Sequence, residues 1–364
     1  MGMTIKDLLK YTSDNDASDL HISVGHTPMV RLNGKLCAVP DQEDLTREEM
    51  QAHLRAILTN EQFEKFQAMK DFDMSYELDG VARYRVNVFV QRRGEAAAFR
   101  LIPTRIRKLE ELGMPSHLYS LTRLSQGFIL VTGPTGSGKT TTLAALLDHA
   151  NATRHDHIIT VEDPIEYVID HQNCIVDQRE VGAHTASFHA ALRSSLREDP
   201  DIILVGEMRD LETISLALTA AETGHLVFAT LHTNSCAETI DRIVDVFPSN
   251  QQQQVRTQLA GTIAAVISQR LVVRADGKGR VPAYEIMMGT SGIRALIREG
   301  KSEQIQSLIQ TGGSISMNTL DACLKRLANE GVITQDEAYR HALNKAAVAP
   351  SLAAAAGIEP PKRR

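Results

Sequence analysis

Residues 133–140 carry the clearest chemistry in the sequence. They read GPTGSGKT, which matches the pattern GxxxxGK[ST], directly after an apolar run at 128–132 and at the start of an amphipathic helical stretch. Glycines allow backbone amides to turn inward around a β-phosphate, and the helix N-terminus adds positive potential. We expect Lys139 to reach the β- and γ-phosphate oxygens and the Thr140 hydroxyl to bind Mg²⁺. The residues predicted to hold the nucleotide in this loop are Gly133, Thr135, Gly136, Ser137, Gly138, Lys139, Thr140 and Thr141.

A carboxylate at position 207 stands where an acid on the metal side of the nucleotide is expected. Glu207 follows the apolar run 202–205 within the sequence GEMRD, so a parallel sheet would place it at the carboxyl edge beside the loop. Hydrolysis needs such an acid, and we expect Glu207 and Thr140 to bind the Mg²⁺ that accompanies ATP. Glycine and glutamate stand here in place of the more usual direct aspartate. The alternative is a solvated carboxylate that starts a helix.

A second acidic cluster follows the run 158–161 at the same predicted edge. It reads EDPIEY, and Pro164 ends the strand and turns the acids toward the site. One of these acids could polarise the attacking water. We favour Glu166 over Glu162 for that role. The alternative is that the cluster caps a helix or forms a turn.

Histidines and arginines supply the remaining candidates. His225 and His232 bracket the apolar run 226–230, and no third ligand accompanies them, so their spacing does not indicate a metal pair. A neutral histidine near the γ-phosphate could sense it through a hydrogen bond, although a lone histidine can also be a packing residue. Hydrolysis further needs a positive group against the charge that develops on the γ-phosphate. The arginines that could supply it, each of which could instead form a surface salt bridge, are Arg83, Arg85, Arg92, Arg93, Arg100, Arg193 and Arg197.

The elements that must position these residues follow from the hydrophobic pattern. Runs 128–132, 158–161, 202–205 and 226–230 alternate with helical segments, which predicts a buried parallel sheet in an α/β core over 113–290. Residues 1–112 alternate strand-like runs with turns, carry an Asn33-Gly34 hairpin signal and one helical stretch at about 48–69, and predict an α+β module. Residues 291–345 are helical in pattern, and the Ala- and Pro-rich segment 346–364 predicts a flexible tail.

Composition excludes several classes of function. The chain has 364 residues and a formal net charge of −6, and aromatic residues make up 4%, which disfavours a nucleic-acid surface. The sequence contains no run of 18 or more apolar residues, so no membrane-spanning helix is predicted. Four scattered cysteines form no CxxC pair and are typical of reduced cytosolic thiols. We therefore expect a cytoplasmic enzyme.

Four sequence blocks in order resemble the motifs of the secretion and type IV pilus motor ATPases. They are GPTGSGKTTT (133–142), ITVEDPIEY (159–167), IILVGEMRD (202–210) and AAETGHLVFATLHTNSCAETIDRI (220–243), which resemble the Walker A, Asp, Walker B and His boxes. ASDLH (17–21) followed by Asn33-Gly34 resembles the start of the family's N-terminal domain. Residues 288–299 and 309–321 resemble the C-terminal signature of the pilus retraction members. The resemblance covers about 3–345.

This resemblance implies a fold, a reaction and an assembly. The fold is a RecA-like P-loop ATPase core preceded by a PAS-like α+β N-terminal domain, with C-terminal helices. The reaction is ATP hydrolysis that powers pilus retraction and twitching motility, in a homohexamer with Mg²⁺. The partners are a polytopic inner-membrane platform protein and a companion retraction ATPase, with the ring docked peripherally at the inner membrane and no nucleic acid. The roles implied for residues are water activation by Glu166, a Walker B acid at Glu207, the His-box pair His225 and His232, and bridging of subunits by Arg83, Arg85 and Arg100.

Two departures from the superfamily pattern bear on whether the motor assembles or retracts a pilus. Assembly motors usually carry a tetracysteine zinc insertion after the His box, whereas residues 271–287 contain no cysteine, which favours retraction. The retraction signature usually begins Ala-Ile-Arg-Asn, whereas the segment 292–295 here reads GIRA. Two other functions stay open as alternatives. They are a nucleic-acid translocase on the same core, and a scaffold that binds ATP for assembly and hardly hydrolyses it.

Overall fold

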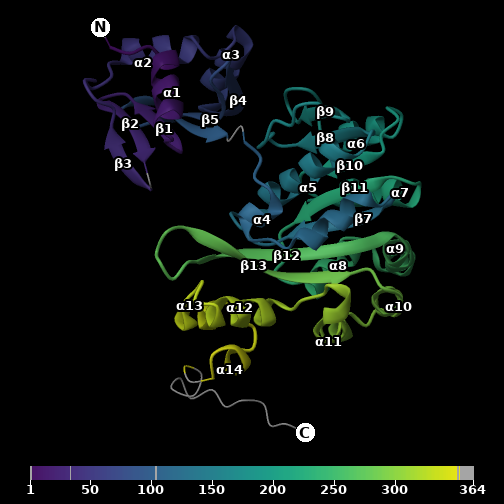
Figure 1. Ribbon diagram of the computed structural model, residues 1–364. Coiled ribbons are helices and arrows are strands. Elements are labelled where there is room, and N and C mark those ends of the chain that lie inside the picture. Colours follow the sequence, from purple (N-terminus) through teal and green to yellow (C-terminus); the bar gives the residue numbers. More distant parts are fainter. Residues whose placement is uncertain (1, 33, 103–104, 351, 353–364) are drawn as a thin grey trace. The chain divides into compact units, whose positions relative to one another are not determined.

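The computed structural model describes residues 2–32, 34–102, 105–350 and 352 (Figure 1). It divides into two compact units. The first comprises the residues up to 105 together with 164–168, and the second comprises 106–163 and 169–364. The predicted boundaries at 112 and 290 stay predictions.

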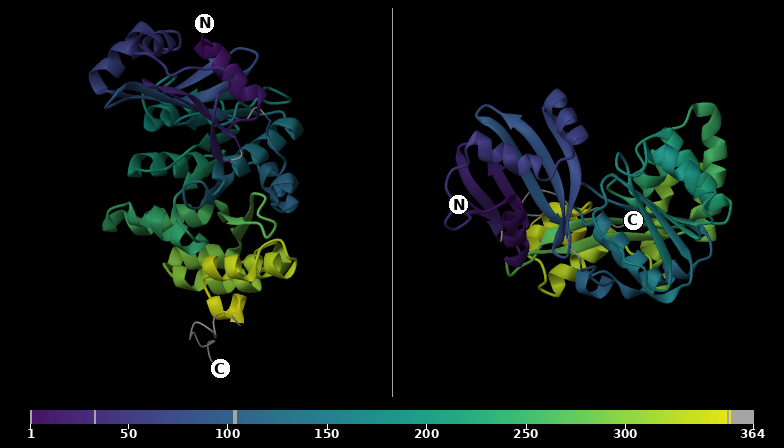
Figure 2. Two further views of the ribbon diagram at one scale, coloured as in Figure 1. Left: turned by 90° about the vertical axis from the view of Figure 1, so that its left-hand side faces the viewer. Right: turned by 90° about the horizontal axis from the view of Figure 1, so that it is seen from above.

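The first unit is built around a six-stranded antiparallel sheet in the order β3-β2-β1-β6-β5-β4. Helices cover one face of it, where alternate residues of β5 such as Tyr84, Val86 and Val88 are fully buried (Figure 2). This confirms the predicted strands and the hairpin, in which Leu32 pairs with Lys35, although Asn33 lies outside the described residues. The elements are α1 (Ile5–Asp14), β1 (Asp19–Ser23), β2 (His26–Leu32), β3 (Lys35–Ala38), α2 (Arg47–Arg55), α3 (Asn60–Met69), β4 (Asp71–Leu78), β5 (Ala82–Gln91) and β6 (Gly94–Ile102).

The helical stretch predicted at about 48–69 is helical in the structure but is divided between two helices, α2 and α3. Thr59 caps a new helix by accepting from the backbone N–H of Gln62, whose side chain in turn accepts from the N–H of Thr59. A Thr-x-x-Gln capping box starts a helix and favours a break before it. The break is therefore local in origin and was readable in the sequence.

The second unit is built around a seven-stranded mixed sheet in the order β13-β12-β7-β11-β10-β8-β9. All neighbours are parallel except β12 and β13. The four predicted strands are confirmed as β7, β8, β10 and β11, and nearly all of their residues are buried. The strands are β7 (Gly127–Thr132), β8 (His157–Glu162), β9 (Ile175–Glu180), β10 (Ile202–Val205), β11 (Leu226–Leu231), β12 (Ile263–Val273) and β13 (Arg280–Met288).

Helices cover both faces of this sheet, which explains why its strands are apolar throughout. One hydrophobic core packs α5 and α12 against one face of the sheet. A second core packs the helices from α7 through α11 against the other face. The helices are α4 (Leu109–Leu112), α5 (Lys139–Thr153), α6 (Phe188–Ser195), α7 (Leu211–Glu222), α8 (Cys236–Asp245), α9 (Ser249–Thr262), α10 (Ser291–Glu299), α11 (Ile305–Thr311), α12 (Leu320–Asn329), α13 (Gln335–His341) and α14 (Lys345–Val348).

The C-terminal part of the chain follows the predicted helical pattern. Helices α10 to α13 lie within 291–345, and α14 continues to Val348. Most of the predicted flexible tail, 346–364, lies outside the described residues. Among the helices of the described ranges, none combines the length and the hydropathy needed to cross a bilayer.

Candidate nucleotide site

The loop between β7 and α5 has the geometry of a phosphate cradle. Gly133, Gly136 and Gly138 all have positive φ, at +143°, +76° and +88°. A Cβ at Gly133 would lie 2.1 Å from the carbonyl oxygen of Gln269, so only glycine fits beside β12. A Cβ at Gly136 would meet nothing within 4 Å, so this part of the loop opens onto free space.

Lys139, the first residue of α5, folds its ammonium back over this loop. Its Nζ donates to the carbonyl oxygens of Gly133 at 2.9 Å and Pro134 at 3.2 Å, and lies 3.5 Å from His232 Nδ1. The Ser137 hydroxyl is buried and has no hydrogen-bond partner among the described residues. A buried ammonium beside an unpartnered hydroxyl fits an anion with several oxygens, such as a phosphate chain.

Glu207 and His232 meet at the carboxyl edge of the sheet, as the strand order requires. Strand β10 pairs with β11, and β11 pairs with β7, so the residues after these three strands converge. Glu207 Oε1 lies 3.0 Å from His232 Nε2, while Glu207 Oε2 accepts from Arg209 Nη2 at 2.7 Å. The structure therefore brings together Lys139, His232 and Glu207, three of the residues predicted for the site.

Gly206 explains why Glu207 has glycine before it. A Cβ at position 206 would lie 3.0 Å from the carbonyl oxygen of Val161 and 3.2 Å from Glu162 Cα on the neighbouring strand. The backbone of Gly206 is also tied to β11, because its carbonyl accepts from the Thr230 hydroxyl. The close approach of β8 thus requires a residue without a side chain, and the acid stands one position later.

Arg209 is the main cause of the lowered pKa of Glu207. The hydrogen bond from Arg209 lowers the pKa of Glu207, partial burial opposes this, and the charges of Arg209, His232 and Lys139 add to the lowering. Glu207 is therefore ionised at neutral pH, as an acceptor for Mg²⁺ or a water molecule must be.

Replacing Arg209 with glutamine should make the stability of the protein less sensitive to acid. Because the pKa of Glu207 lies below its ordinary 4.5, the pair stabilises the fold above that pH and loses this contribution as pH falls further. We expect the variant to be destabilised by less than about 1 kcal/mol at pH 7, since the pair is partly exposed, and the difference to vanish toward pH 3. Urea unfolding at several pH values measures it, and a difference independent of pH would contradict the assignment.

The two glutamates of the second cluster lie in contrasting environments. Glu162 is buried, and its Oε1 accepts from the Thr160 hydroxyl at 2.8 Å and from Gln178 Nε2 at 3.2 Å. Glu166 is exposed and forms no hydrogen bond or ion pair with the described residues. It belongs to the stretch 164–168, which groups with the first unit. The preference for Glu166 over Glu162 as the water-activating residue stays a prediction.

The two histidines lie at opposite ends of β11 and do not share a site within one chain. The register pairs Leu226 with Gly127 and Leu231 with Thr132, so His225 lies at the amino edge of the sheet, about 20 Å from His232. His225 Nδ1 lies 2.9 Å from the carbonyl oxygen of Ala220. Within the chain only His232 approaches the loop, and a catalytic role for His225 stays a prediction.

The three predicted arginines lie on one face of the six-stranded sheet in the first unit. The register places Arg85 directly opposite Arg100, and Arg83 lies two residues before Arg85. Arg100 pairs with Asp19 at 3.0 Å, and Arg83 donates to the Ser75 hydroxyl at 3.0 Å. Two like charges directly opposite each other destabilise a sheet, and the buried carboxylate of Asp19 offsets this repulsion by pairing with Arg100.

The sequence interpretation missed Gln269, which forms a wall of the site. Gln269 is buried on β12; its Nε2 donates to the carbonyl oxygen of Ser137 at 2.8 Å, and its Oε1 accepts from the Thr142 hydroxyl at 3.0 Å. It borders a cavity of about 400 Å³ that continues from Gly138 and Thr141, a size suited to a nucleoside. Other residues lining this cavity include Arg107, Glu111, Leu271, Lys278 and Arg280. Nothing in the local sequence around Gln269 indicates a contact 130 residues away.

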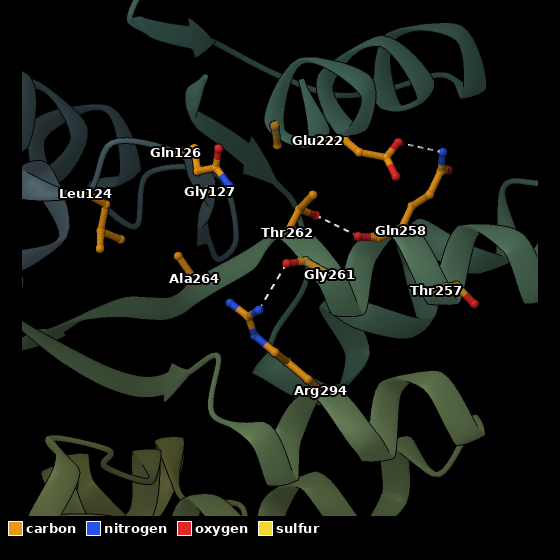
Figure 3. A pocket seen from close by; sticks show the side chains of 11 residues that line it. Leu124, Gln126, Gly127, Glu222, Thr257, Gln258, Gly261, Thr262, Ala264 and Arg294 are labelled. Atoms are coloured by element: carbon orange, nitrogen blue, oxygen red, sulfur yellow. Dashed lines mark hydrogen bonds between the residues drawn. The ribbon is translucent and has the colours of Figure 1, made fainter. Parts of the chain in front are cut away.

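The segment that resembles the retraction signature forms α10 and holds a structural arginine. Arg294 donates to three carbonyl oxygens, those of Gly289 at 2.8 Å and of Gly261 and Ile263 at 3.0 Å each. It thereby closes the C-terminal end of α9 onto the start of β12, beside a second cavity of about 300 Å³ (Figure 3).

Replacing Arg294 with alanine should destabilise the second unit by about 2 kcal/mol, because three carbonyls lose a charged donor. Arg298 on the same helix is exposed, so Arg298→Ala is the matched control and should change stability by less than about 0.5 kcal/mol. Urea unfolding of both variants measures the difference. Equal effects of the two substitutions would show that the three hydrogen bonds of Arg294 do not stabilise the unit.

Several known proteins are similar to this chain in sequence and in structure. The type II/IV secretion system protein family matches residues 3–340. The type IV pilus retraction ATPase PilT of Pseudomonas aeruginosa is 52% identical over 340 residues, which is 93% of this chain and 98% of that protein. A twitching motility protein of Neisseria gonorrhoeae is 48% identical over 318 residues, 87% of this chain and 85% of that protein.

Among solved structures, the crystal structure of the pilus retraction motor PilT with bound ADP superimposes with a TM-score of 0.88. It is 46% identical, with 94% of this chain and 97% of that chain covered. These similarities confirm the predicted resemblance. Because the family matches most of the chain and both relatives are similar over nearly their whole length, the chain belongs to the type II/IV secretion system protein family.

Proposed function

We propose that this chain is an ATP-hydrolysing motor that powers retraction of a type IV pilus. The observation that supports this most is the convergence of Lys139, His232 and Glu207 around a glycine loop, in a chain that is 52% identical to a pilus retraction ATPase. The phosphate loop, His232 and Glu207 belong to the second unit, and pilus retraction is the work that ATP hydrolysis drives.

The loop residues bind the triphosphate and orient it. Lys139 exchanges its bonds to the carbonyls of Gly133 and Pro134 for phosphate oxygens, and the Ser137 hydroxyl becomes a donor to them. The base and ribose occupy the cavity beside Gln269. Thr140 and Glu207 offer the oxygen ligands that Mg²⁺ prefers, and the ion would neutralise phosphate charge there.

His232 links the nucleotide to the acid. Its ring lies between Lys139 and Glu207, so a γ-phosphate that draws Lys139 away changes the hydrogen bonds on Nδ1 while Nε2 stays on Glu207. His232 therefore reports whether the γ-phosphate is present. Glu166 activates the attacking water.

The remaining parts of the proposal concern the assembly and follow the family resemblance. The second unit is a RecA-like core, and the first is a PAS-like domain. Six chains form a ring, and Arg83, Arg85 and Arg100 complete the site of another subunit. His225 acts at this interface. The ring docks on a polytopic platform protein at the cytoplasmic side of the inner membrane, with a companion retraction ATPase as a second partner.

A deletion strain tests the proposed work, with the intact gene restored as control. Cells without the protein should carry more surface pili than normal and should not twitch, because pili are assembled and never withdrawn. Cells without pili would indicate an assembly motor instead. Stimulation of ATP turnover by DNA that is lost at high salt would indicate a nucleic-acid translocase.

A further inference from the structure

Glu285 on β13 is a deeply buried carboxylate outside the nucleotide site. Its exposed fraction is 1%, and its Oε1 accepts from the backbone N–H of Cys236 at 2.8 Å. Its Oε2 is buried and has no hydrogen-bond partner among the described residues. Burial of a carboxylate is costly unless its oxygens are bonded, so a residue of this kind calls for a reason beyond packing.

The backbone N–H that Glu285 accepts from lies at the start of α8. Cys236 is the first residue of this helix, and a carboxylate at a helix N-terminus is favoured by the helix dipole. The turn that leads into the helix, residues 232–235, begins with His232. Ser235, the last residue of this turn, caps the N-terminus of α8, because its hydroxyl accepts from the N–H of Glu238. Glu285 thus bonds to Cys236, which lies four residues after the histidine that contacts both Lys139 and Glu207.

Threonine hydroxyls hold the same turn from the side of the phosphate loop. Thr239 Oγ1 lies 2.7 Å from Thr233 Oγ1 and donates to the hydroxyl of Thr132 at 3.4 Å, and Thr132 directly precedes Gly133. All three hydroxyls are buried. The turn that carries His232 is therefore attached to the loop on one side and to β13 on the other.

The strand that carries Glu285 is itself fixed along both edges. Glu285 pairs with Ser268 of β12 in the sheet. The outer edge of β13 is bonded to Asn318, which accepts from the N–H of Ile286 at 2.8 Å and donates to its carbonyl at 3.1 Å. An acceptor on such a strand can determine where the helix begins, since it has little freedom to follow the helix.

We propose that Glu285 is a positioning residue for ATP hydrolysis: by accepting from Cys236 it sets the start of α8 and so the place of His232 between Lys139 and Glu207. This rests on the proposed ATPase function and on the role of His232. A displacement of about 1 Å in a reacting group can cost about a hundredfold in rate. Loss of the acceptor should therefore lower the turnover number far more than it weakens nucleotide binding.

The test replaces Glu285 with methionine, which keeps an unbranched side chain of similar length but removes the acceptor. We expect the full-length variant to lose about tenfold to a hundredfold in the turnover number, with the KM for ATP and the affinity for ADP within twofold of wild type. Glu285→Gln keeps an acceptor oxygen and should restore most of the activity. The matched control is Glu337→Met, because Glu337 is also buried and accepts from a backbone N–H, that of Val273 at 2.8 Å, at the far end of β12.

A double-mutant cycle with His232→Ala separates positioning from general stability. If Glu285 acts through His232, Glu285→Met should change turnover by less than twofold in the His232→Ala background. Equal losses in both backgrounds, or an equal loss in Glu337→Met, would overturn the proposal. If Glu285→Met does not fold, Glu285→Asp, which withdraws the acceptor by one methylene, takes its place in the cycle. Absence of ATP turnover in the wild type would instead refute the proposed function itself.

Discussion

Replacing Lys139 with alanine is expected to lower ATP turnover about a thousandfold while the protein stays folded. The substitution removes a buried ammonium whose three hydrogens point at the loop and at His232. In the part of the chain that the structure describes, no other lysine is hydrogen-bonded to the loop, so no lysine already in place can replace its charge at the phosphates. Phosphate release at saturating ATP measures the loss, and an affinity measurement with ADP shows how much of it is binding.

The matched control for this prediction is Lys325→Ala on the exposed side of α12. This variant should hydrolyse ATP at the wild-type rate, because it removes the same charge from a position far along the chain from the loop and unconnected with it. Both variants should unfold at the wild-type temperature within a few degrees. Turnover by Lys139→Ala within threefold of wild type would contradict the assignment of residues 133–140 as the catalytic phosphate loop.

The parts of the fold that could be predicted are those encoded by short, local patterns. Strands β7, β8, β10 and β11 are continuous apolar runs because helices cover both of their faces, and the loop motif lies between a strand and a helix as its chemistry requires. The helix break before Thr59 was missed although its capping box is equally local. Helix-forming residues continue across the break, so the stretch reads as helical on both sides of it.

The parts that could not be predicted depend on contacts between distant residues. The β12–β13 hairpin adds two strands beside β7, and only this order brings Gln269 against Gly133 and Glu285 against Cys236. The separation of His225 from His232 was predictable, because the two residues bracket the apolar run that forms β11, although both belong to one motif. Motif membership thus predicts which residues matter better than it predicts which of them meet within a single chain.

The second large effect is expected for Glu166, whose replacement by glutamine should lower turnover about 10²–10⁴-fold with little change in the KM for ATP. An amide can still bond to water but cannot accept its proton. The two glutamates of this cluster differ in their remaining capacity to accept a proton from water. Glu166 is exposed and unpartnered among the described residues, whereas Glu162 already accepts from Thr160 and Gln178 in a buried position.

Glu162→Gln is therefore the control that makes the Glu166 prediction decisive. Its amide would place a donor beside Gln178 Nε2, so we expect a loss of about 1–3 kcal/mol in the free energy of unfolding, with turnover reduced by less than tenfold. Thermal unfolding and single-turnover hydrolysis of both variants give the comparison. If Glu162→Gln abolished turnover and Glu166→Gln did not, the general base would lie on the buried acid, and the hydrogen bonds from Thr160 and Gln178 would have to be reinterpreted as tuning it.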